Sequence, residues 1–271
     1  MRPAASLGDE RFDQSRPEVA VSVVVPTLNE AQNLPHVLTR IPPDYEIVLV
    51  DGNSTDGTPD VARALRPDTR IVTQSRRGKG EALACGFAAA EGDIIVMLDA
   101  DGSAKPEEIA SFVDALVAGA DFAKGSRFVA GGGSSDITWL RSTGNALLSG
   151  LVNLLFRTRY TDLCYGYNAF WRHCLPAMRV DCDGFEVETL INIRVARAGL
   201  RVVEVPSFED SRIHGASNLR TFRDGWRVLR TIVRERLRSA TGIQVAQESP
   251  GGRVSTEAVE AVDAIPASAT T

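Results

Sequence analysis

Two carboxylates, Asp99 and Asp101, stand one residue apart at the end of a short apolar run. Residues 94–98 are all apolar, which predicts a buried strand that ends at the first carboxylate. Two like charges this close repel each other unless a cation lies near them. Oxygen ligands suit Mg²⁺ or Mn²⁺, which complete their shells with water and substrate phosphates. The pair therefore predicts a metal–diphosphate site, while an Asp that caps the next helix is the alternative interpretation.

Alternating strands and helices must position this pair. Apolar runs predict strands covered on both faces at residues 20–26, 45–51, 70–75, 93–101 and 121–128. Helical patterns lie between the strands, at residues 29–41, 57–65, 78–92 and 106–119. This order predicts an α/β fold, a mostly parallel sheet flanked by helices. Ligands of such sheets bind beyond the carboxyl ends of the strands, so we expect one rim formed by residues 26–30, 51–54, 75–79 and 99–102.

Length and composition predict a single folded domain. The chain has 271 residues, 44% of them hydrophobic, and a formal net charge of -5. The polar segment 1–18 and the Ala-, Ser- and Thr-rich segment 241–271 predict disordered tails around a domain at 19–240. The four cysteines show no C-x-x-C spacing, which favours free thiols over a zinc site. The acidic net charge argues against a nucleic-acid partner.

Common nucleotide-binding motifs do not follow the predicted strands. The first strand is followed by PTLNE in place of G-x-G-x-x-G, which disfavours a dinucleotide enzyme. Lys79 stands between glycines at the start of a predicted helix. It is either a phosphate or base contact or a solvated basic turn, and the residues alone leave both open.

Several motifs in register carry a family resemblance. VVVPTLNEAQNL, VDGNSTDGT, RRGKGEAL and MLDADGSAKPEE resemble the family 2 glycosyltransferases of the GT-A fold. The later segments GSRF, GGG, WLR, DLCYGY, GFEVETLI and RIHGASNL are similar to the dolichyl- or polyprenyl-phosphate mannose and glucose synthases. The resemblance covers about residues 20–230. It implies inverting transfer of a hexose from a nucleotide sugar to polyprenyl phosphate at the cytoplasmic membrane face, with GDP-mannose favoured and UDP-glucose next.

The resemblance also implies residue roles for the donor. Asp99 and Asp101 match the family's metal-binding pair, for Mg²⁺ or Mn²⁺. The positions that match donor-binding residues are Pro26, Leu28, Glu30, Val50, Asp51, Lys79, Asp99, Ala100, Asp101, Arg127, Arg212 and Asn218.

On the acceptor side, Arg127 and Arg141 match arginines that bind the lipid phosphate. Guanidinium suits this role because it forks onto phosphate oxygens and stays charged. A phosphate acceptor is largely ionised near neutral pH, with a second pKa of about 6, so no strong general base is needed. Asp162 and either Glu186 or Glu188 match acidic positions near the sugar. Residues two apart on a helix point different ways, so we expect only one of the two glutamates, Glu188, to face the site.

Three positions depart from the family pattern. Gly52 stands where a second Asp is common, Asn218 where a Lys is common, and the segment YGYN at 165–168 replaces SGFR. These departures leave two alternatives open. One is an enzyme of the same fold acting on a soluble acceptor, and the other is a non-catalytic nucleotide-sugar-binding protein.

Residues 219–239 predict a basic amphipathic helix. Its arginines are spaced three and four apart, at 220, 223, 227, 230 and 234. Beside them runs an apolar stripe comprising Phe222, Trp226, Leu229, Val233 and Leu237. Such a helix either lies on an anionic membrane or packs its apolar face on the domain, and we favour the membrane. The apolar segment 146–156 is too short to span a bilayer but long enough to line a path for a prenyl chain.

Overall fold

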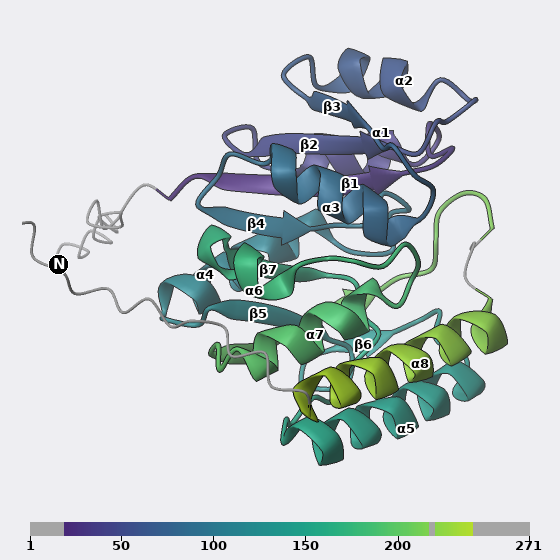
Figure 1. Cartoon of the computed structure of the whole chain (residues 1–271). Helices are drawn as coiled ribbons and strands as arrows, with labels where there is room; N and C mark the ends of the chain where they lie inside the picture. Colours follow the sequence, from purple (N-terminus) through teal and green to yellow (C-terminus); the bar gives the residue numbers. More distant parts are fainter. Residues whose placement is uncertain (1–18, 217–219, 241–271) are drawn as a thin grey trace, which may run out of the picture.

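A computed structural model describes residues 19–216 and 220–240, which form an α/β fold (Figure 1). Its main sheet has seven strands in the order β3-β2-β1-β4-β7-β5-β8. The strands are β1 Val21–Thr27, β2 Glu46–Asp51, β3 Arg70–Thr73, β4 Ile94–Met97, β5 Phe122–Ser126, β7 Asn168–Trp171 and β8 Val202–Pro206. A small sheet pairs β6 Gly133–Ser134 with β9 Phe208–Glu209. The predicted tails and Asn218 lie outside the described residues.

The sheet is mixed and mostly parallel, which confirms the predicted fold class. β1 runs parallel to both β2 and β4, and β5 runs parallel to β8. β7 lies between β4 and β5 and is antiparallel to both. All five predicted strands are present. The strands β7 and β8 were not predicted.

Helices cover both faces of the sheet. They are α1 Leu34–Val37, α2 Thr58–Leu65, α3 Lys79–Ala89, α4 Ile109–Val117, α5 Trp139–Phe156, α6 Leu175–Met178, α7 Val187–Arg197 and α8 Thr221–Ala240. The short 3-10 helices are η1 Leu38–Arg40, η2 Pro106–Glu108 and η3 Arg172–Cys174.

The helix predicted at 29–41 begins only at Leu34, so that prediction was wrong for its first turn. Asn29 has a positive φ of 57°, a conformation that stops a right-handed helix. The Asn29 side chain accepts a hydrogen bond from the Thr55 backbone N–H at 2.8 Å. This contact ties the loop after β1 to the loop after β2, and so keeps both at the rim.

Each face of the sheet is covered by its own apolar cluster, because side chains alternate along a strand. Along β1, Val23 and Val25 belong to one cluster and Val24 to the other. A third cluster lies away from the sheet, between α5, α7 and α8, and is built around Val152, Ile193 and Ile232. It fixes α5 and α8 side by side at one end of the molecule, as Figure 1 shows.

Candidate active site

A pocket of about 430 Å³ opens at the carboxyl ends of the parallel strands. One wall, here called the sheet side, comes from residues after β1, β2 and β4 together with the start of α3 and Arg212. The opposite wall, here called the helix side, comes from Arg127, the 136–137 segment, the first turns of α5 and α8, and residues 164–165. All four predicted rim segments contribute residues to the sheet side, so the segments expected to form one rim do line one pocket.

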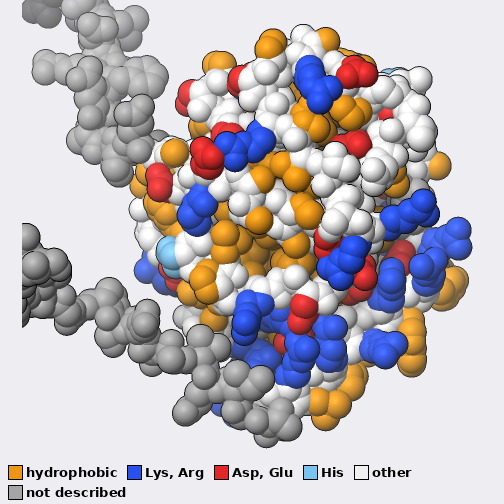
Figure 2. All heavy atoms as spheres, turned by 45° about the horizontal axis from the view of Figure 1, so that its top comes forward, with side chains coloured by type: hydrophobic (Ala, Val, Ile, Leu, Met, Phe, Trp, Pro, Cys, Tyr) orange, Lys and Arg blue, Asp and Glu red, His pale blue; other side chains and the backbone are white. Residues whose placement is uncertain are grey.

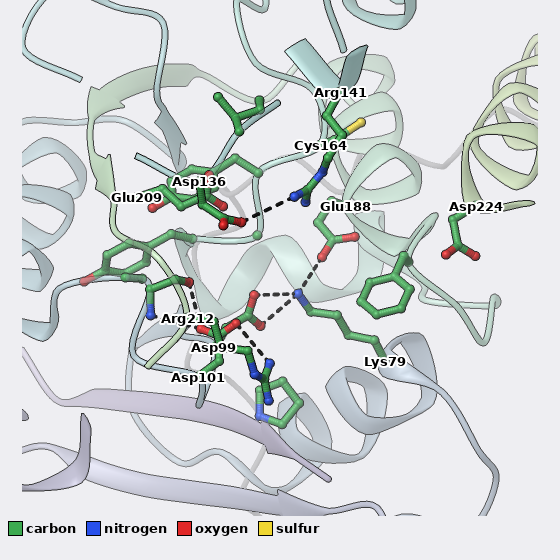
Figure 3. Close-up of a pocket in the computed structure, with 18 of the residues that line it drawn as sticks. Lys79, Asp99, Asp101, Asp136, Arg141, Cys164, Glu188, Glu209, Arg212 and Asp224 are labelled. Atoms are coloured by element: carbon green, nitrogen blue, oxygen red, sulfur yellow. Dashed lines mark hydrogen bonds and ion pairs between the residues drawn. The ribbon is translucent and has the colours of Figure 1, made fainter. Parts of the chain in front are cut away.

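Lys79 bridges two carboxylates on the sheet side. Its Nζ lies 2.8 Å from Asp99 Oδ1 and 2.8 Å from Glu188 Oε1, as the dashed lines in Figure 3 show. Burial by itself lowers the pKa of Lys79, but Asp99 and Glu188 outweigh burial and raise it. Burial also raises the pKa of Glu188, and Lys79 offsets this only in part. Lys79 is therefore a charged group held inside the pocket, and the solvated-turn interpretation was wrong.

Close backbone packing brings Lys79 to this position. Gly78 has a φ of 118°, and a Cβ there would lie 1.9 Å from the Asp183 carbonyl oxygen. The next glycine, Gly80, donates its N–H to the same oxygen at 3.0 Å. A Cβ at Gly166 would lie 2.9 Å from Lys79 Nζ, so that glycine leaves room for the ion-pair cluster. Glycine at these positions lets α3, α7 and the 164–167 segment converge on one lysine.

Arg212 forms a second bridge on the sheet side. Its guanidinium contacts Asp101 Oδ2 at 3.3 Å and pairs with Glu30 Oε1. Asn33 holds Glu30 from the other side with a 2.6 Å hydrogen bond to Oε2. Asp101 is also fixed by Ser103, whose hydroxyl donates to Oδ1 at 2.7 Å. Each carboxylate of the 99/101 pair thus has its own cation, which is how the two like charges coexist (Figure 3).

The donor set at this pair suits a hard divalent cation that shares its shell with a substrate. Asp99 and Asp101 offer carboxylate oxygens to the pocket, with 37% and 23% of their side-chain surfaces exposed. Within residues 19–216 and 220–240, no three His, Cys, Asp or Glu side chains cluster in a way that could hold a metal. The two carboxylates therefore fit a cation whose remaining ligands are diphosphate oxygens and water. They do not fit a metal site in which protein side chains supply every ligand.

Arg127 lies on the helix side, but its charge is already engaged. Its Nε and Nη2 contact both oxygens of Asp162 at 2.7 and 2.9 Å, and its Nη1 contacts Glu209 at 2.9 Å. The Arg127 and Asp162 side chains are 5% and 0% exposed. Hydrogen bonds from Arg127 hold the pKa of Asp162 below its usual range, against the effect of burial. Arg127 therefore fixes the end of β5, and its guanidinium N–H groups are directed at Asp162 and Glu209 and not at a ligand in the pocket.

Arg141 is placed differently, in the first turn of α5. Thr138 caps the helix by accepting the Arg141 N–H at 3.3 Å. The guanidinium of Arg141 points into the pocket, where its ion pair within the described residues is with the exposed Asp136 at 3.4 Å (Figure 3). Asn145 follows on the same helix face, and its amide nitrogen is buried with no hydrogen-bond partner. An accessible guanidinium and an unpaired amide donor together can bind an anion.

The remaining predicted residues divide into those that line the pocket and those that do not. Pro26, Leu28, Glu30, Lys79 and Ala100 line it. The other members of the predicted set are placed elsewhere: Val50 packs in the core, Asp51 accepts the Ser54 N–H at 3.1 Å, and Asp162 is buried behind Arg127. Of the two glutamates, Glu188 lines the pocket and Glu186 does not.

Sequence reasoning did not identify several pocket residues. They are Gln74, Asp136, Asn145, Cys164, Phe185 and Glu209, whereas Leu148 lies in the segment 146–156 that was predicted to line a prenyl path. Cys164 is exposed and forms part of the pocket wall. Asn145 could have been found by its helical spacing from Arg141, which places both residues on one face of the helix.

The chain that forms this pocket matches a known protein family. The model described as glycosyl transferase family 2 matches residues 22–179. The chain belongs to glycosyltransferase family 2. It is 34% identical over 218 residues to polyprenol monophosphomannose synthase of Mycolicibacterium smegmatis, covering 75% of this chain and 82% of the relative. It is also 34% identical over 201 residues to undecaprenyl-phosphate mannosyltransferase of Micrococcus luteus, covering 69% of this chain and 82% of that protein.

Solved structures agree on the fold of this family 2 glycosyltransferase. Glucosyl-3-phosphoglycerate synthase of Mycobacterium tuberculosis, in complex with Mn²⁺, UDP and glucosyl-3-phosphoglycerate, superposes with a TM-score of 0.64. The two are 25% identical, and the match covers 80% of each chain. The fold is therefore GT-A-like, as predicted. The predicted metal pair stands at the end of β4, at the sheet edge where the pocket opens.

Proposed function

We propose that this glycosyltransferase moves mannose, with inversion, from a nucleotide sugar to a polyprenyl phosphate at the cytoplasmic membrane face. GDP-mannose is the favoured donor and UDP-glucose the next. The observation that carries the proposal is the two-sided pocket, with paired carboxylates on the sheet side and Arg141 on the helix side. Relatives named as polyprenyl-phosphate mannose synthases support the sugar and the acceptor.

The sheet side suits the nucleotide diphosphate. We assign Pro26, Leu28 and Glu30 to the base and ribose, with Val50 and Asp51 shaping the strand end behind them. Lys79 and Arg212 are the cations nearest the carboxylate pair, and each can exchange a carboxylate for a phosphate oxygen. When bound by Asp99 and Asp101, Mg²⁺ or Mn²⁺ would offset the negative charge that develops on the leaving diphosphate.

The helix side suits an acceptor phosphate. A phosphate oxygen attacks the anomeric carbon, the new carbon–oxygen bond forms, and the bond to the nucleoside diphosphate breaks with its electron pair on the leaving oxygen. Arg141 and the unpaired Asn145 amide hold the acceptor phosphate. Arg127 and Asp162 hold the helix-side wall in place and do not bind substrate directly, because they are ion-paired with each other and Arg127 is also paired with Glu209. Glu188 holds Lys79 beside the sugar.

Hexose transfer with purified protein tests this proposal. Labelled GDP-mannose and UDP-glucose are supplied separately, each with polyprenyl phosphate and Mn²⁺ or Mg²⁺, and product is read in the lipid phase. We expect mannosyl lipid that disappears in Asp101→Asn. Absence of transfer from both donors, with a protein that is folded and binds nucleotide, would refute the proposal. A thermal-shift screen of the same donors identifies the one that stabilises the folded state.

A second candidate is transfer to a soluble phosphorylated acceptor. One observation favours it: the superposed structure from Mycobacterium tuberculosis carries glucosyl-3-phosphoglycerate together with UDP. Its acceptor carries a phosphate, which Arg141 would also bind. Transfer from UDP-glucose to 3-phosphoglycerate, with none to polyprenyl phosphate, would favour this candidate.

A further inference from the structure

Helix α8 carries its apolar stripe on the side that faces away from the domain. Phe222, Trp226 and Leu237 are 82%, 67% and 64% exposed. The inward side of the helix is instead formed by Asp224, Val228, Thr231, Ile232 and Glu235, each at most 6% exposed. The interpretation in which the stripe packs on the domain was therefore wrong. The residues that hold α8 in place lie on the opposite side from the apolar stripe.

Helix α5 repeats this arrangement beside α8. Trp139, Leu147 and Leu154 are 78%, 71% and 77% exposed, whereas Asn145, Ser149 and Val152 are buried. No charged residue occurs between positions 142 and 156. An outward helix face without a charge over four turns is unusual for a surface in contact with water. The segment 146–156, which sequence reasoning assigned to a prenyl path, therefore also has an outward face of its own.

The two helices form one surface because they pack against each other through a shared apolar cluster (Figure 1). We call this surface the outer face; its exposed apolar residues are Trp139, Leu140, Leu147, Leu154, Phe222, Trp226, Val233 and Leu237. Contiguous exposed apolar patches of this kind mark contact with a membrane or a protein.

The charges around the outer face indicate which of these two partners it meets. Helix α8 carries six arginines, at 223, 227, 230, 234, 236 and 238. Its two acidic residues, Asp224 and Glu235, are buried at 6% and 1% exposure. Figure 2 shows Lys and Arg side chains gathered over the lower part of the molecule, with hydrophobic side chains along the lower edge. Arg234 and Arg238 pair with Asp181, at 3.4 and 3.0 Å, so the positive charge that α8 presents to solvent comes mainly from Arg223, Arg230 and Arg236.

We propose that α5 and α8 together dock on an anionic lipid bilayer, with the outer face inserted at the headgroup level and the α8 arginines on lipid phosphates. Exposed Trp and Phe beside arginines suit the boundary between headgroups and acyl chains. Among the described residues, no helix is long and apolar enough to cross a bilayer. The outer face is thus a means of holding this part of the chain on a membrane without a spanning helix.

The position of the pocket gives the surface a further consequence. The first turns of both helices also line the pocket, through Leu140 and Arg141 on α5 and Thr221 and Gly225 on α8. A phosphate at the bilayer surface would therefore meet Arg141 while its prenyl chain stays among the lipids. This consequence rests on the proposed acceptor, whereas the docking itself does not.

Vesicle binding of the full chain tests the docking. Flotation is measured with phosphatidylcholine vesicles alone and with vesicles that also contain phosphatidylglycerol. We expect flotation with the anionic vesicles, weakened by salt. Brominated lipids report depth: Trp139 and Trp226 should be quenched in single-Trp variants. Trp171 donates its indole N–H to the Leu116 carbonyl, within the domain, and should stay unquenched. Quenching of Trp171 alone, or no flotation on either vesicle, would overturn the proposal.

Matched variants separate docking from folding and from catalysis. Leu147→Gln/Leu154→Gln and Trp226→Gln remove the outer face, and Val117→Gln on α4 is the control, with a valine that is 42% exposed. We expect vesicle binding to fall at least tenfold in the first two variants and to stay unchanged in the third. If instead the chain is a dimer that these variants convert to a monomer, with vesicle binding unaffected, the face is a contact between copies and the proposal fails.

Activity assays with two different acceptors test the membrane docking separately from the proposed function. With a short-chain, water-soluble prenyl phosphate, the outer-face variants should turn over like the unaltered protein. With long-chain polyprenyl phosphate in vesicles, their turnover should fall together with binding. No turnover of either acceptor by the unaltered protein would refute the proposed function but leave the flotation result standing. Equal turnover of the vesicle acceptor by all variants would refute the role of docking in acceptor delivery.

Discussion

The two sides of the pocket use arginine and lysine in different ways. On the sheet side, Lys79 bridges the partly exposed Asp99 to the buried Glu188, and Arg212 bridges the partly exposed Asp101 to the buried Glu30, so each cation has one carboxylate partner that faces the pocket. On the helix side, Arg127 is paired with carboxylates at 0% and 13% side-chain exposure, whereas Arg141 pairs with the exposed Asp136 at 3.4 Å. The same side chain is thus a structural anchor at one position and an available ligand at the other.

Burial of the partner explains this difference. A buried carboxylate without its cation costs several kcal/mol, so Arg127 cannot leave Asp162 for a substrate without a large penalty. An exposed pair contributes about 1 kcal/mol or less, so Arg141 can exchange Asp136 for a phosphate. Residue type therefore indicates that a phosphate can bind at this wall, and burial decides which arginine binds it.

Removal of Arg127 should have the largest effect on stability. We expect Arg127→Met to lower the free energy of unfolding by about 3–5 kcal/mol, because Asp162 is left buried and unpaired. Urea denaturation measures this change. Arg141→Met should change stability by less than about 0.5 kcal/mol and raise KM for the acceptor. The double variant Arg127→Met/Asp162→Leu should recover part of the loss, and equal stability losses for the two single variants would contradict the comparison.

Loss of a carboxylate on the sheet side should act on turnover instead. We expect Asp101→Asn to lower kcat by about 10²–10³-fold, the cost of one missing electrostatic contact to a developing charge. The melting temperature should change little, since Asp101 is partly exposed and Ser103 retains a partner. Asp44→Asn, an exposed residue before β2, is the matched control. Full activity of Asp101→Asn would show that the carboxylate pair does not take part in catalysis.

Metal and nucleotide should bind to the sheet side cooperatively. Lys79 and Arg212 occupy the carboxylates when no diphosphate is present, and a diphosphate gives both cations a new partner. We expect Mn²⁺ to bind about 5–150-fold more tightly in the presence of the nucleoside diphosphate. Titration calorimetry of Mn²⁺ with and without nucleotide measures the ratio. In Lys79→Met the ratio should shrink, and an unchanged ratio would mean that Lys79 does not compete for Asp99.

Acid should weaken the helix-side anchor with a defined sign. The folded-state pKa of Asp162 is depressed, so its contribution to stability is present above the unfolded value of about 3.9. That contribution is lost as pH falls below this value through the lower folded-state pKa. Urea denaturation between pH 7 and pH 3 should therefore show a loss of stability at the acid end. Arg127→Met/Asp162→Leu should lose less stability at acid pH than the unaltered protein. A larger loss in this variant would contradict the depressed pKa of Asp162.

The sheet side could be predicted in detail, and the reason is local. Apart from Arg212, which the resemblance indicated, its groups follow directly after a predicted strand or start the next helix, and parallel strands bring those points to one edge. The exception was the loop after β1, where the positive φ of Asn29 and its contact to Thr55 replaced the first turn of a predicted helix. That contact joins residues 26 positions apart, and no local pattern signals it.

The helix side could be predicted only in part. The resemblance pointed to Arg127 and Arg141, but Glu209 had no signal of its own, and Asn145 had only its helical spacing from Arg141. Arg127 and Glu209 are 82 positions apart and meet because β5 and β8 pair in parallel. The sequence also could not indicate that Gly166 leaves room for the Lys79 ammonium, because that depends on how close the two residues lie in the folded chain.

The sequence by itself determined the α/β order, the rim of the sheet and the carboxylate pair at its centre, because hydrophobic periodicity and strand ends are local properties. It also determined that residues 219–239 are amphipathic. Only the tertiary structure decided that the apolar stripe of α8 points outward and lies beside the uncharged face of α5. It likewise decided that Arg127 is neutralised and Arg141 is not. Both outcomes depend on which side chains become buried together, and burial is a property of the packed chain.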